Sequence, residues 1–165
     1  MSHETVESSA RPVLDGVSRI THSELCDSVE RVVQTGRLGT PVSVRLHWEF
    51  RESTGQMNTI LAAAVSIADC VLDLETPVWR IRRHASGRTL NVIGTDQRGR
   101  SLMITLVAQA TPQTALTVFG NHGIVRLDDG WVDPATILES VAERSWFAGL
   151  QTALCGTSAG TSADV

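Results

Sequence analysis

The chain has 165 residues, a mass of 17.8 kDa and a formal net charge of −4, so its length fits one ordinary domain. Hydrophobic residues make up 42% of the chain and charged residues 19%, which is typical of a globular protein with a packed core. The acidic balance disfavours binding to nucleic acid, and no stretch is apolar enough to predict a membrane span. All 14 basic residues are arginine, so chemistry that needs a lysine is excluded.

The three cysteines, Cys26, Cys70 and Cys155, are widely spaced and form no CxxC pair. This spacing predicts neither a disulfide framework nor a zinc site. The first twelve residues, MSHETVESSARP, are polar and contain no apolar signal segment. We therefore expect a cytoplasmic protein with a flexible leader over residues 1–16 and a disordered tail over residues 155–165.

Hydrophobic periodicity predicts a helix that begins near Ser23 and ends before Gly36, and a second helix over Met57–Leu74. Between them, apolar residues alternate strictly with polar ones from Val42 to Arg51. Such alternation is typical of a strand in a sheet that is covered on one face only.

The second half of the chain is rich in predicted strands separated by turn residues, which favours an antiparallel meander. A closing helix is expected after Asp133, with Phe147, Leu150 and Leu154 among its buried residues. The fold predicted for residues 17–154 is α+β, a mainly antiparallel open sheet of about six strands with helices packed on one face. The further strands are expected at Val78–His84, Arg88–Thr95, Ser101–Gln109, Thr114–Phe119 and Ile124–Asp128.

Several short motifs in this order resemble the C-terminal domain of the Gfo/Idh/MocA oxidoreductases. Residues 35–44 read TGRLGTPVSV, which is similar to the family's helix end, turn and strand. The helix that contains Asp69 and runs to Pro77 resembles a second element, and the FGNHG turn at residues 119–123 resembles a third. The resemblance covers roughly Val17 to Leu154 and implies the fold of that domain.

Three features that this family uses for hydride transfer have no counterpart in the sequence. There is no GxGxxG loop, and no Rossmann domain precedes the matched region. The family's catalytic lysine is missing, and Ser66 stands where the family has a histidine three residues before the helix Asp69. The resemblance therefore implies a free-standing relative of the domain that binds no cofactor and performs no hydride transfer of its own.

Candidate site residues lie first on the polar face of the strand over residues 42–51. Arg45, His47, Glu49 and Arg51 share this face, and His47 and Glu49 are close enough along the strand to touch. The pair could act as a general base held by a carboxylate. The same residues could equally form an exposed or interfacial polar face.

A second group, Arg80, Arg82 and His84, could bind an anionic ligand or a partner through its guanidinium groups, or could simply be solvated. Asp69 is a candidate acid or base, although burial with hydrogen bonds to the backbone is the simpler interpretation. No metal-ligand spacing is present.

Two functions remain open at this point. The first is an accessory, substrate-binding or oligomerisation subunit of an oxidoreductase system. It would associate with itself through the open sheet face, and with a separately encoded Rossmann-type subunit or a small-molecule ligand. The second is a small cofactor-independent isomerase, dehydratase or cyclase that uses His47, Glu49 or Asp69 in a cavity between sheet and helices.

Overall fold

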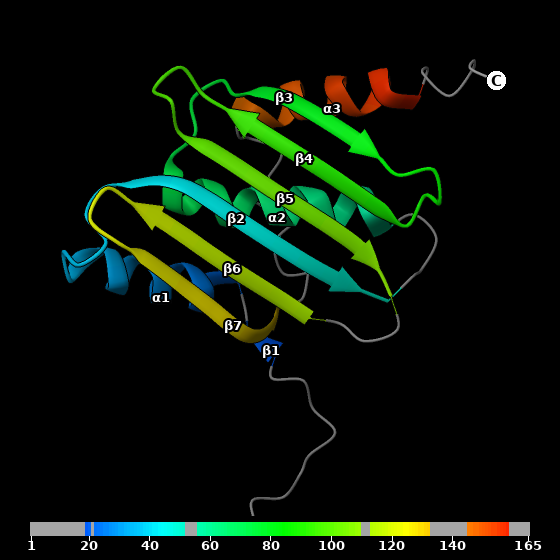
Figure 1. Ribbon diagram of the computed structural model, residues 1–165. Coiled ribbons are helices and arrows are strands. Elements are labelled where there is room, and N and C mark those ends of the chain that lie inside the picture. The colour runs from blue at the N-terminus through cyan, green and yellow to red at the C-terminus, as the bar shows by residue number, and fades with distance from the viewer. Residues whose placement is uncertain (1–18, 21, 52–55, 110–112, 133–144, 159–165) are drawn as a thin grey trace, which may run out of the picture.

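The computed structural model describes residues 19–20, 22–51, 56–109, 113–132 and 145–158. Within these residues, seven strands form one sheet in the order β1-β7-β6-β2-β5-β4-β3, and three helices accompany it (Figure 1). The elements are β1 (Arg19–Ile20), α1 (His22–Gln34), β2 (Pro41–Phe50), α2 (Gln56–Leu72), β3 (Val78–Arg83), β4 (Thr89–Thr95), β5 (Ser101–Ala108), β6 (Gln113–Gly120), β7 (Ile124–Val132) and α3 (Ser145–Ser158).

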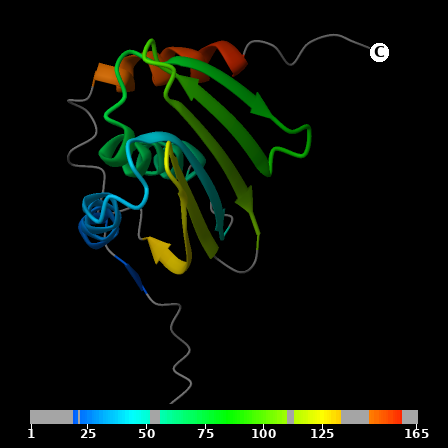
Figure 2. The same cartoon turned by 60° about the vertical axis from the view of Figure 1, so that its left-hand side comes forward.

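The helices lie on one face of the sheet, and no element of the described residues covers the other face, as Figure 2 shows from the side. Helix α2 packs on β2 and β5, α1 packs on α2, and α3 packs against β3. Along β2 the apolar side chains Val44, Leu46, Trp48 and Phe50 are buried, whereas Arg45 on the opposite face is exposed. The predicted α+β fold with a sheet covered on one face is therefore confirmed.

The prediction of an antiparallel meander was wrong in one respect. The sheet is mixed, because it contains parallel as well as antiparallel strand pairs. Strands β3, β4 and β5 are consecutive and antiparallel, and β6 pairs antiparallel with β7. Strand β2, however, lies between β5 and β6 and runs parallel to β5. Four residues separate Ala108 from Gln113, which is enough chain to reach the roughly 10 Å across an intervening strand.

The last helix is longer than the sequence predicted. Helix α3 continues to Ser158, so four residues of the segment that was assigned to the tail are helical. Leu150 is buried in the core, and Phe147 and Leu154 pack against it, as expected. Asp133, after which the closing helix was expected, and the leader over residues 1–16 lie outside the described residues.

The turn between α1 and β2 is hydrogen-bonded to the turn between β6 and β7. The His122 and Asn121 amides donate to the carbonyl oxygens of Leu38 and Thr40, each at 3.1 Å. The Thr40 amide in turn donates to Asn121 Oδ1 at 2.8 Å. Gly120 completes this contact, because a Cβ there would overlap the Leu38 carbonyl oxygen.

Replacing Gly120 with alanine is expected to lower the free energy of unfolding by about 1–3 kcal/mol, because the clash is with backbone that cannot turn away. Gly156, which has open space around its Cβ position, provides the matched control. Gly156→Ala should leave stability unchanged or raise it slightly. Urea unfolding followed by far-UV circular dichroism measures both, and equal effects of the two substitutions would contradict the contact.

The structure also shows that the prediction against disulfide bonding was wrong. Cys26 of α1 and Cys70 of α2 form a disulfide with a Cα–Cα distance of 6.3 Å, and Cys155 is free and exposed. Sequence spacing gave no sign of this bond because the partners lie 44 residues apart and meet only when α1 packs on α2. Among the described helices, none is both long and apolar enough to cross a membrane.

Candidate functional site on the open sheet face

The uncovered surface of the sheet, called here the open face, consists of the side chains of β3, β4, β5, β2 and β6 that point away from the helices. Strand register places these side chains in rows that run across the sheet. One row contains Arg80, Ile93, Met103, Arg45 and Thr117, one residue from each strand. Two adjacent apolar side chains therefore lie between two arginines across the middle of the open face.

Several apolar side chains on this face are exposed. Ile93 is 40% exposed and Met103 is 39% exposed, and they are direct cross-strand neighbours. Val78 on the edge strand β3 is 70% exposed. Contiguous exposed apolar side chains rimmed by polar ones are typical of a surface that contacts another molecule.

His47 and Glu49 meet on the open face, as their spacing predicted. The His47 Nε2 atom lies 3.1 Å from Glu49 Oε1, with side chains 42% and 20% exposed. In the neighbouring positions on β5 and β4, the Thr105 hydroxyl donates to Asn91 Oδ1 at 2.9 Å. This arrangement is a partly exposed polar ladder in the open face rather than an enclosed cleft.

The structure separates Asp69 from this pair. Asp69 is 5% exposed near the end of α2, and one carboxylate oxygen accepts the Leu74 amide at 2.9 Å. Helix α2 packs on the covered face of the sheet, whereas His47 and Glu49 lie on the open face. A cavity between sheet and helices therefore cannot bring Asp69 together with His47 and Glu49.

The arginines predicted to bind a ligand or partner fall on the same open face. Arg80 and Arg82 project from β3 in register with Ile93 and Asn91, and the Arg45 guanidinium lies 6.0 Å from the centre of the Phe119 ring. Among the described residues, no carboxylate is within ion-pair distance of these three arginines.

His84 is placed differently from these arginines. It lies just after β3, where its Nδ1 atom is 3.0 Å from the Ser86 hydroxyl oxygen. In the described part of the chain, no group of three or more metal-ligating side chains is present.

Sequence reasoning missed the contribution of β4 and β5 to this surface. Ile93 and Met103 were assigned to strands, but no face was assigned to them. The sequence carries little signal for these faces, because residues 102–107 of β5 read LMITLV and five of the six are apolar, unlike the alternating pattern of β2. The register that joins these positions into rows could not be predicted, because it depends on β2 inserting beside β5.

No protein-family model matches the chain, and no curated protein matches it. Solved structures do match. A probable dehydrogenase from Thermotoga maritima is 13% identical over 65% of this chain and 39% of its own, with a TM-score of 0.51. GenD2 from gentamicin A biosynthesis, solved with NAD, is 17% identical over 63% of this chain and 36% of its own, also with a TM-score of 0.51.

Myo-inositol dehydrogenase from Lactobacillus casei is 18% identical over 62% of this chain and 35% of its own, with a TM-score of 0.50. The matched region is thus well under half of each of these dehydrogenases. The chain has the fold of the C-terminal domain of Gfo/Idh/MocA-type dehydrogenases, as the short motifs indicated. Two of those motifs, the turn before β2 and the turn after β6, contact each other through the hydrogen bonds of Leu38 and Thr40.

Proposed function

We propose that this domain is an accessory subunit of an oxidoreductase system that self-associates through the open face and performs no hydride transfer of its own. The observation that carries the proposal is the uncovered sheet surface, where exposed Ile93 and Met103 stand between Arg45 and Arg80. Arginine and methionine are enriched in protein interfaces. The fold likeness to dehydrogenase domains supports the link to oxidoreductases.

A second copy of the chain is the partner that this surface fits. Most soluble homo-oligomers are twofold symmetric, so each residue of such an interface meets a residue of the same patch. Arg45 and Glu49 lie on the same face of β2 with His47 between them. A twofold axis that lies in the plane of the interface and crosses β2 at right angles near His47 would therefore place Arg45 opposite the partner's Glu49. Face-to-face packing of this kind would bury on the order of 1,600 Å² in total.

Charge reversal tests this arrangement. Glu49→Arg and Arg45→Glu should each weaken the dimer by about tenfold or more, because each places like charges opposite one another. The double variant Arg45→Glu/Glu49→Arg should recover most of the affinity, since it restores opposite charges across the axis. Light scattering over a concentration series measures the dissociation constant.

The matched control is Arg31→Glu, the same charge reversal on α1, which lies on the covered side of the sheet (Figure 2). This substitution should leave the dimer unchanged. A monomer at tens of micromolar, or a dimer indifferent to both single reversals on β2, would contradict self-association through the open face.

The proposal also implies that the protein does not bind a nicotinamide dinucleotide by itself. The 165 residues contain no glycine-rich loop of the kind that holds a pyrophosphate against a helix N-terminus. Calorimetric titration with NADH should therefore show no stoichiometric binding in the micromolar range. Saturable one-to-one binding with a micromolar dissociation constant would sink this part of the proposal.

A separately encoded Rossmann-type oxidoreductase is the further partner that the accessory role requires. Mixing the purified protein with such a subunit from the same source, followed by gel filtration, would test that association.

A further inference from the structure

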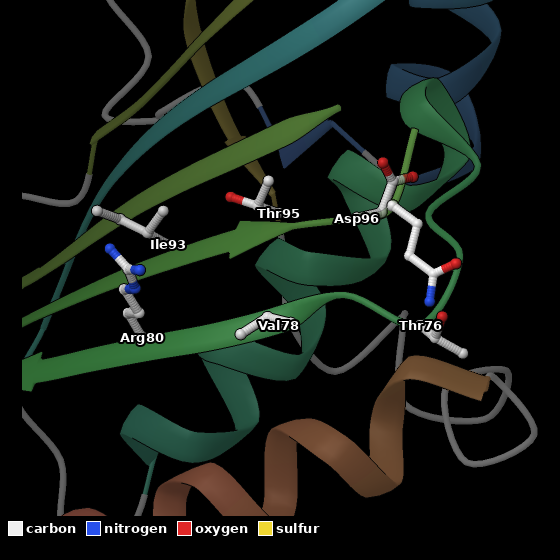
Figure 3. A pocket seen from close by; sticks show the side chains of 7 residues that line it. Thr76, Val78, Arg80, Ile93, Thr95 and Asp96 are labelled. Carbon is white, nitrogen blue, oxygen red and sulfur yellow. The ribbon is translucent and has the colours of Figure 1, made fainter. Parts of the chain in front are cut away.

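A hollow of about 420 Å³ lies on the open face beside the turn that joins β4 to β5 (Figure 3). It is distinct from the His47–Glu49 pair, which lies two strands away on β2. The residues that matter for its chemistry are Thr76, Val78, Arg80, Ile93, Thr95 and Gln97.

The lining of the hollow has a positive charge at Arg80 and apolar side chains next to it. Arg80 and Ile93 are cross-strand neighbours, and Val78 and Thr95 form the next pair in the same direction. Figure 3 shows Thr76 beyond that pair, at the far end from Arg80. The hollow therefore offers a cation, then an apolar stretch between Val78 and Ile93, and then hydroxyl and amide groups.

The only acidic residue that lines the hollow, among those described, is Asp96, and its carboxylate is already occupied. Asp96 Oδ2 accepts Arg100 Nε at 2.8 Å and lies 2.7 Å from Arg100 Nη2. Asp96 Oδ1 accepts the amides of Arg98 and Arg100 at 2.9 and 3.0 Å. Within the described residues Arg80 has no carboxylate partner, so its guanidinium is available to an anion from outside.

We propose that this hollow binds a small organic monocarboxylate. Its carboxylate would pair with the Arg80 guanidinium, whose planar fork matches the two oxygens of a carboxylate. The hydrocarbon stem would lie against Val78 and Ile93. Polar substituents at the far end would find the hydroxyl groups of Thr95 and Thr76. This binding site goes beyond the accessory role, because it assigns the protein a ligand class that self-association does not need.

Hexanoate is a suitable probe because of its length. Two neighbouring side chains on the same face of a strand, such as Arg80 and Val78, are about 7 Å apart, and extended hexanoate, at roughly 8 Å, spans that distance. In ¹⁵N-edited NMR titrations of the full chain, the amides of Arg80, Ile93 and Thr95 should shift saturably. A ligand of this size on an open site is expected to bind with a dissociation constant of about 1–10 mM. Hexan-1-ol, which keeps the stem and lacks the charge, should cause no saturable shift, and neither should sodium chloride.

The matched variants are Arg80→Gln and Arg83→Gln, which remove the same charge from opposite faces of β3. Arg80→Gln should weaken hexanoate binding about tenfold or more, while Arg83→Gln should leave it within about twofold. Absence of saturation at 100 mM hexanoate, or equal effects of the two variants, would overturn the proposal. Because Arg80 and Ile93 also belong to the surface proposed for self-association, the titration is run at a protein concentration at which light scattering shows a monomer. Failure of hexanoate binding in the monomer is then separate from failure of the dimer to form at higher concentration.

Discussion

Replacing Asp96 with alanine is expected to lower the free energy of unfolding by about 3–5 kcal/mol. The Asp96 side chain is completely buried, and the side chain of its partner Arg100 is 14% exposed. Arg100 also donates from Nη1 to the Leu72 carbonyl oxygen at the end of α2. Removing the carboxylate would leave a nearly buried guanidinium without its counter-ion and loosen the attachment of α2 to the β4–β5 turn.

Urea unfolding followed by circular dichroism and by tryptophan fluorescence measures this change in the free energy of unfolding. The matched control is Asp73→Asn, because the Asp73 side chain is 85% exposed and lies 3.7 Å from Arg98. Asparagine also tolerates the left-handed backbone of this position, where φ is 48°. An exposed ion pair of this kind contributes little, so the control should lie within about 0.5 kcal/mol of the parent. If Asp96→Ala lowered the free energy of unfolding as little as Asp73→Asn, the buried pair would not be holding α2.

Reduction of the Cys26–Cys70 disulfide should lower the free energy of unfolding by about 2–4 kcal/mol, because it releases a cross-link over 44 residues in the unfolded chain. The comparison is urea unfolding with and without dithiothreitol. Thiol titration of the denatured protein should find one free thiol before reduction and three after it.

Two variants make the disulfide experiment specific. Cys26→Ser should start at the lower stability and lose its response to dithiothreitol. Cys155→Ser should behave like the parent, because Cys155 is free and exposed. Three free thiols in protein purified without reductant, together with no effect of reductant on stability, would show that the bond does not form.

The faces of the sheet could be predicted from sequence where alternation was strict. Leu46 and Trp48 were assigned to the core, and both are completely buried, while Arg45 and His47 fell on the opposite face as expected. The His47–Glu49 contact followed from the two-residue period of a strand alone. These are local properties, which the order of residues along one strand determines.

The remaining features depend on which segments meet in space. Insertion of β2 between β5 and β6 could not be deduced from the turns, because short turns fix only the strands that they join. Asp96 directly follows the predicted strand Arg88–Thr95, but its pairing with Arg100 and, through Arg100, its link to α2 could not be read from that position. The same holds for Cys26 and Cys70, which lie on different helices.

Oxidation of Met103 by hydrogen peroxide tests the central claim most directly, because this side chain is 39% exposed on the open face. The protein is oxidised at concentrations well below and well above its dimer dissociation constant, and peptide mass spectrometry follows Met103 with half-buried Met57 of α2 as the internal reference. Self-association through the open face predicts that Met103 oxidation slows several-fold at high concentration while Met57 oxidation does not change. Equal Met103 rates in samples whose masses are those of a monomer and a dimer would contradict it.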